Sequence, residues 1–134
     1  MRIETEDYVT LEVARLLKEK GFKEMCHAYW WVYKNLNRLD NYDYIFTKEW
    51  LEANHECYDE VLLAPTLYEA QKWLRKEKGL YVEVSYMTGD YYIYDILTIP
   101  QHDLVGLDEP RHFSYPNTYE EVLNAGILEA LKLI

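Results

Sequence analysis

Two cysteines and two histidines form a set of residues that could bind a metal ion. They occur as Cys26-His27 and His55-Glu56-Cys57. Two thiolates and two imidazoles would suit tetrahedral zinc, and a small metal-dependent enzyme could use such a site. The spacing argues against it, because Cys26 and His27 are adjacent and would point to opposite faces of a strand. We therefore expect two thiols without a disulfide, no metal and no cofactor.

Glu83 and Asp95 are a carboxylate pair that could perform acid–base chemistry. If both faced one cleft, they could cleave a glycosidic bond, as in a small hydrolase. No serine-nucleophile, phosphate-binding or zinc-hydrolase motif accompanies them. We expect no catalytic residue. An enzyme that uses this pair, or the cysteine–histidine set, is the alternative to a binding function.

The elements that must position these residues are clearest between Ala64 and Ile99. Thr66 and Glu69 form a capping box, which predicts a helix over about 66–78 that ends at Gly79. Alternating apolar residues then predict a β-hairpin over about 80–99.

The length of the hairpin turn decides which side chains face the core, because a slip of one residue exchanges the two faces. A two-residue turn at Gly89-Asp90 places Asp95 on the core face together with Ile93, Leu97 and Ile99. A three-residue loop sets Asp95 opposite Glu83 among solvated side chains, and the core face then consists of Tyr92, Tyr94, Ile96 and Thr98. We favour the two-residue turn because it pairs β-branched residues.

In the favoured register, three tyrosines share a face with one carboxylate. This surface consists of Tyr81, Glu83, Tyr92 and Tyr94. Acidic, aromatic surfaces are typical of protein interfaces, so these four residues are the predicted binding residues.

Helices are also predicted near both ends of the chain, over about 10–20 and 118–133. Thr5 or Thr10 caps the first, and Gly21 ends it. Thr118 and Glu121 form a capping box for the second, and Gly126 in its apolar stripe indicates close approach to the sheet.

The remaining elements are predicted from β-favouring residues and turn signals. Met25–Tyr33 is predicted as a strand whose core face carries Cys26, Ala28, Trp30 and Val32. The other expectations are a loop or hairpin connection over Asn35–Asp43, one or two helical turns within Thr47–Asn54, a short strand at Val61–Leu63, and an edge strand at Arg111–Tyr115. The whole predicts one α+β domain over 1–134, with an antiparallel sheet of about three to four strands packed against helices.

Composition limits the classes of partner. The net charge of −10 disfavours binding to nucleic acids and anionic membranes. It favours a protein as the partner, and a basic protein fits this charge best. Lys and Arg are absent between Gly79 and Pro110. No apolar run is long enough to span a bilayer, so we expect a soluble, cytoplasmic protein. A homo-oligomer is compatible with the abundance of tyrosine and tryptophan.

Three segments carry a resemblance. They are Tyr8-Val9-Thr10 before Leu16-Leu17-Lys18-Glu19-Lys20-Gly21-Phe22, then Ala64-Pro65-Thr66 before Gln71-Lys72-Trp73-Leu74-Arg75, and Thr118-Tyr119-Glu120-Glu121 before Ala125-Gly126-Ile127. Together they resemble a group of small uncharacterised proteins of gut Bacteroidetes and their phages. The similarity lapses between Asn35 and Cys57. It implies a phage or prophage context in a bacterial host, and it transfers no functional residue.

The sequence therefore favours a non-enzymatic accessory or protein-interaction protein. One variant is an acidic inhibitor whose carboxylates imitate the phosphates of DNA.

Overall fold

The computed structural model describes residues 5–42, 47, 49–51, 57–106 and 117–134. The chain forms two compact units, Met1–Thr66 and Leu67–Ile134. The α+β class is confirmed. The strands form two antiparallel sheets of three strands each, where the sequence had suggested one sheet. The single domain stays a prediction beside these two units.

The first unit begins with a short 3₁₀ turn, η1 (Thr5–Asp7), and the helix α1 (Leu11–Glu19). Of the two predicted caps, Thr10 is the correct one, since its hydroxyl accepts a hydrogen bond from the Val13 amide at 3.4 Å. Gly21 has φ +98°, and the Phe22 amide donates to the Leu17 carbonyl at 2.8 Å. The predicted glycine end of this helix is confirmed.

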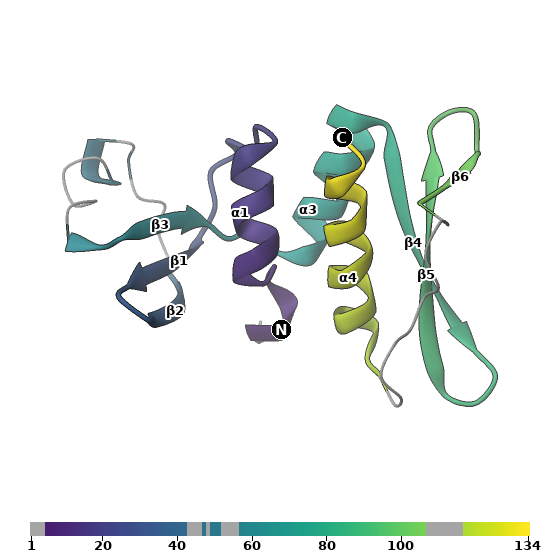
Figure 1. The fold of residues 1–134 in the computed structure, drawn as a ribbon, viewed down its shortest axis with the longest axis horizontal. Coiled ribbons are helices and arrows are strands. Elements are labelled where there is room, and N and C mark those ends of the chain that lie inside the picture. The colour runs from purple at the N-terminus through teal and green to yellow at the C-terminus, as the bar shows by residue number, and fades with distance from the viewer. Residues whose placement is uncertain (1–4, 43–46, 48, 52–56, 107–116) are drawn as a thin grey trace. The chain divides into compact units, whose positions relative to one another are not determined.

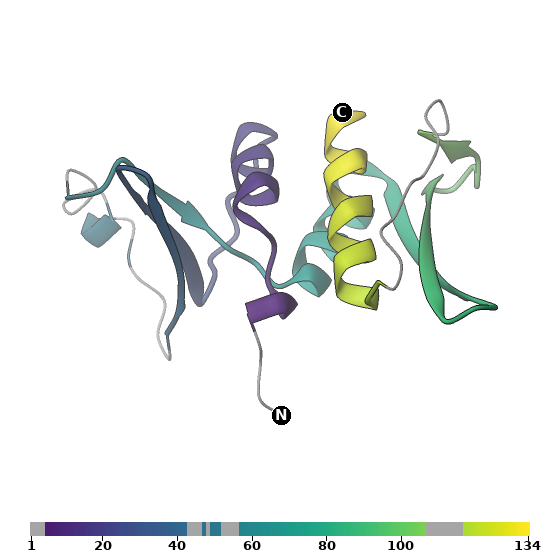
Figure 2. The same ribbon diagram turned by 60° about the horizontal axis from the view of Figure 1, so that its bottom comes forward.

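The sheet of the first unit has the strand order β2-β1-β3 (Figures 1 and 2). Its strands are β1 (Ala28–Tyr33), β2 (Leu36–Asn41) and β3 (Glu60–Leu63). The short strand predicted at 61–63 is confirmed. The prediction of a loop or connection over Asn35–Asp43 was wrong for most of that segment, because Lys34 takes a left-handed conformation at φ +56° and turns the chain back at once along β1.

Both faces of β1 are buried, which corrects the prediction of one core face. Ala28, on the predicted core face, is buried and packs with Tyr8 and Ala64. The opposite face carries Tyr29 and Trp31, which are 0% and 5% exposed. The prediction used only the alternation of side chains within this strand. It had no information about the residues from other segments that cover the second face. Of the predicted turns over Thr47–Asn54, residues 49–51 are helical and 48 and 52–54 lie outside the described residues.

The second unit begins with the helix α3 (Leu67–Trp73), which continues as a π-helix, η3 (Leu74–Lys78). Gly79 ends it in a left-handed conformation at φ +64°, and its amide donates to the Leu74 carbonyl. The predicted range and glycine end are confirmed. The wider winding of the last five residues was not predicted.

The hairpin consists of β4 (Leu80–Met87) and β5 (Tyr91–Thr98), joined by a three-residue loop. The favoured two-residue turn was therefore wrong, and the alternative register is the one observed. It pairs Val82 with Ile96 and Glu83 with Asp95. In this register Tyr94 and Ile96 are buried on one face, and that burial outweighs the β-branched pairing on which the prediction relied.

The helix α4 (Tyr119–Lys132) covers one face of the hairpin (Figures 1 and 2). Thr118 caps it by accepting a hydrogen bond from the Glu121 amide at 3.1 Å. The close approach predicted at Gly126 is confirmed, because a Cβ atom there would lie 2.5 Å from Val82 Cγ1. A third strand, β6 (Leu104–Val105), pairs with β5 and was not predicted. The strand predicted at Arg111–Tyr115 lies outside the described residues.

Asn117 extends this sheet with its side chain. Its Oδ1 accepts from the Tyr92 amide at 2.8 Å, and its Nδ2 donates to the Tyr92 carbonyl at 3.1 Å. β6 pairs with β5 at Ile96 and Leu97. At Tyr92, outside this pairing, the Asn117 side chain makes the two hydrogen bonds that a neighbouring strand could make.

We expect Asn117→Ala to lower the free energy of unfolding by about 1–2 kcal/mol, because it removes both bonds. Asn117→Asp should cost more, since a carboxylate has no N–H for the Tyr92 carbonyl and would face it with a negative charge. Urea unfolding followed by circular dichroism measures both losses. Equal stability of the aspartate variant and the wild type would contradict the assigned bonds.

Candidate functional site

The four predicted binding residues do not form one surface. The observed register places Tyr81 and Glu83 on one face of the hairpin and Tyr92 and Tyr94 on the other. The second face is the one that α4 covers, where Tyr94 is 8% exposed. Tyr92 packs edge-on against Tyr119 with ring centroids 5.8 Å apart. The shared acidic, aromatic face was therefore a wrong prediction, and its cause is the turn length.

The carboxylates of the predicted hydrolase pair are direct neighbours across the hairpin. Glu83 pairs with Asp95, and Glu83 is exposed. Side chains directly opposite in a sheet have Cβ atoms about 5 Å apart, and like charges at that distance repel. Neither residue lines either of the two cavities described below. Glu83 and Asp95 therefore lie on the same face of the hairpin, as the hydrolase alternative required. Neither of the two cavities provides a cleft that they share.

The predicted metal set is only partly within the described residues, since His55 lies outside them. Cys26 is buried, and its thiol donates to the Glu24 carbonyl with a sulfur–oxygen distance of 3.3 Å. Cys57 is exposed, and neither cysteine forms a disulfide. Within the described ranges, no three histidine, cysteine, aspartate or glutamate side chains gather in a way that could hold a metal.

An aromatic cluster occupies the face of the first sheet that the sequence placed outside the core. Trp31 lies at its centre, with ring centroids 4.8 Å from Tyr58 and 6.2 Å from Trp50. Tyr29 and Tyr42 also contact it at 6.0 and 6.4 Å. The alternation of Tyr29, Trp31 and Tyr33 along β1 was the signal for this cluster. The opposite face of the strand was predicted as the core face instead.

A cavity of about 510 Å³ opens at the end of this cluster, and we call it the aromatic pocket. Tyr33 and Leu36 pair across the β1–β2 hairpin and line the exposed part of this pocket. Their side chains are 48% and 74% exposed. The full described lining is Trp31, Tyr33, Leu36, Asn37, Arg38, Cys57 and Tyr58. Tyr33 and Leu36 are neighbours that line this cavity together, and a contiguous exposed apolar surface of this kind marks a binding site.

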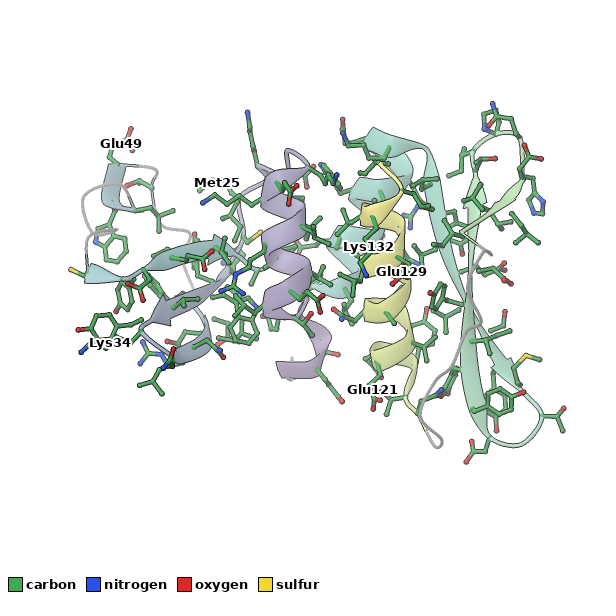
Figure 3. All side chains as sticks on the ribbon, viewed as in Figure 1. Met25, Lys34, Glu49, Glu121, Glu129 and Lys132 are labelled. Atoms are coloured by element: carbon green, nitrogen blue, oxygen red, sulfur yellow. The ribbon has the colours of Figure 1, made fainter. Side chains whose placement is uncertain are left out.

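Charges close to the aromatic pocket are engaged with neighbours. Arg38 forms an ion pair with Asp40. Lys34, labelled in Figure 3 at the β1–β2 turn, lies over the Tyr33 ring at 5.3 Å. Elsewhere on the unit, Arg15 donates hydrogen bonds to the Glu60 carboxylate, and these bonds raise the pKa of Arg15. Recognition at the aromatic pocket must therefore come mainly from apolar and aromatic contacts.

A second cavity, of about 530 Å³, lies between α1, the segment after it and β3, and we call it the lysine pocket. Its described lining consists of Ala14, Lys18, Phe22, Lys23, Met25, Leu51, Val61 and Leu63. The lining residues come from segments far apart in the sequence, and no motif marks them. Sequence reasoning missed both cavities for this reason.

Across the described ranges, no helix combines the length and the apolar character needed to cross a bilayer. Comparison with known protein families, with curated proteins and with solved structures finds no match to this chain.

Proposed function

We propose that this protein acts by binding another protein, without catalysis, and that the partner contacts the aromatic pocket. The observation that supports this is the exposed pair of Tyr33 and Leu36 beside that pocket. An apolar side chain of the partner would enter the pocket and contact Trp31 and Tyr58. Such buried aromatic contacts supply most of the binding energy in protein interfaces.

Two further observations favour this function over the enzyme alternative. The paired charges of Arg38 and Asp40 leave the pocket without a strong field for a charged substrate. Glu83 and Asp95, the carboxylates considered for hydrolysis, do not line it. The resemblance to proteins of gut bacteria and their phages supports a search for the partner among the proteins of such a host.

The test is photo-crosslinking from position 36 in the host cell. A benzoylphenylalanine at position 36 should give one dominant crosslinked species, and the same residue at position 68 serves as the control. Tyr68 is a matched site because it is also exposed, at 62%, and lies on the other unit. A species containing a second copy of the chain would identify a homo-oligomer as the partner.

The identified partner then allows a quantitative test. Leu36→Asp should weaken binding of the purified partner by about 2 kcal/mol, which is roughly thirtyfold, because it places a charge at an apolar contact. Tyr68→Asp makes the same change in charge and should leave the affinity unchanged. Equal affinities of these two variants, or the same crosslinks from positions 36 and 68, would reject the proposal.

A further inference from the structure

The lysine pocket has an apolar wall. Ala14 of α1 and Phe22 after it are 1% and 4% exposed. Val61 and Leu63 of β3 and Leu51 complete that wall. A cavity of about 530 Å³ is within the range of small-molecule sites, and its lining favours a hydrocarbon over water.

The charge of the pocket is opposite to that of the chain. Lys18 and Lys23 are the charged residues of its described lining, and both are exposed. Within the described residues, neither lysine forms an ion pair. In a protein of net charge −10, an apolar cavity edged by two cations selects an anionic head group by charge complementarity.

The lining also distinguishes between two kinds of anionic ligand. Apart from the two ammonium groups, the described lining side chains carry no hydroxyl, amide or carboxylate. A peptide segment would bring backbone N–H and C=O groups into this apolar wall, where their desolvation would not be compensated. A hydrocarbon chain carries no such groups, and it needs polar partners only at its one charged end.

We propose that the lysine pocket binds an unbranched aliphatic carboxylate, with its hydrocarbon chain along Phe22, Val61 and Leu63 and its carboxylate between Lys18 and Lys23. This ligand class is independent of the protein contact proposed at the aromatic pocket. Met25 stands at the entrance, 48% exposed, beside the C-terminal end of α1 (Figure 3). Its unbranched, flexible side chain can adapt to such a chain.

The experiment is isothermal titration of the full-length protein with dodecanoate below its micellar concentration. Lys18→Glu/Lys23→Glu should weaken binding at least tenfold, because it replaces two attractive charges with repulsive ones. Lys72→Glu/Lys76→Glu is the matched control, since it makes the same change in net charge at two exposed lysines of the other unit. Dodecylammonium, which has the same chain and the opposite charge, should bind the wild type at least tenfold more weakly than dodecanoate.

A second variant tests the apolar part of the pocket. Met25→Trp changes an exposed side chain at the entrance, and the larger ring should obstruct it and lower dodecanoate affinity at least tenfold, with an unchanged circular dichroism spectrum. The proposal is overturned if both lysine double variants bind dodecanoate equally, if dodecylammonium binds as tightly as dodecanoate, or if Met25→Trp retains full affinity. Dodecanoate binding that is absent in the wild type overturns it as well.

Discussion

Alanine at position 126 is expected to lower the free energy of unfolding by about 2 kcal/mol, although alanine is the better helix former. Gly126 lies in the middle of α4, where its replacement by alanine would ordinarily add about 1 kcal/mol of stability. Here the new Cβ would lie 2.5 Å from Val82 Cγ1 and 3.0 Å from Tyr94 Cγ. Both contacts are with buried side chains of the hairpin, so α4 and the sheet would have to separate.

The steric origin of this loss can be isolated with a double-mutant cycle in urea unfolding. Val82→Ala alone destabilises, because it removes two buried methyl groups. Combined with Gly126→Ala, it also removes the atom that the new methyl group meets. The double variant should therefore lose less free energy of unfolding than the two single variants lose together, by about 1 kcal/mol or more. A stabilising effect of Gly126→Ala alone would contradict the packing of α4 on β4.

Replacement of Trp31 by alanine should cost about 3–4 kcal/mol, the largest effect among the changes considered. Trp31 is 5% exposed and contacts the rings of Tyr29, Tyr42, Trp50 and Tyr58. Its removal would leave a large cavity in the aromatic cluster, and the partners, which come from β1 and three other segments, cannot all move into it. If the alanine variant does not fold, Trp31→Phe provides a measurable loss of about 1–2 kcal/mol.

Tyr33→Ala is the matched control for this change. Tyr33 lies on the same face of β1, two residues further along, but it is 48% exposed. Its replacement should cost less than 1 kcal/mol in the same urea titration, because little buried area is lost. Equal losses at positions 31 and 33 would show that the aromatic cluster does not belong to the core.

Helix ends were the most predictable part of this chain, because the signals that set them are local. Thr10 and Thr118 cap helices through bonds to amides three residues away. Gly79 ends a helix through its own left-handed conformation. The close approach at Gly126 was also predictable, since a glycine within an apolar helical stripe has few other uses.

The hairpin register was less predictable, because it depends on atoms outside the hairpin. Apolar and aromatic residues lie on both faces of β4 and β5, so alternation supports two registers. The choice follows from which face meets α4, and α4 is more than twenty residues away in the sequence. That one uncertainty was enough to misplace the predicted binding surface.

The candidate site lay beyond prediction for a related reason. The aromatic pocket combines Trp31, Leu36 and Tyr58, and the lysine pocket combines Lys18, Met25 and Val61. The first set becomes a site only when β1 and β2 have paired, and the second only when α1 and the segment after it lie against β3. The spacing of the lining residues in the sequence does not predict either cavity, since a cavity depends on side-chain volumes in the folded chain and not on a motif.

The burial of both faces of β1 has a consequence for how this strand keeps its alignment. In most strands a slip by one residue is prevented because it would bury polar groups, but along 28–32 both faces are apolar or aromatic. In β1 a slip by one residue must therefore be prevented by differences in side-chain size and not by differences in polarity. Ala28 lies against Tyr8 and Ala64, where the ring of its neighbour Tyr29 would not fit, and Tyr29 fills space that an alanine would leave empty. The alignment of β1 is therefore encoded in the placement of the small Ala28 next to the large Tyr29, and a single enlargement at Ala28 would weaken it.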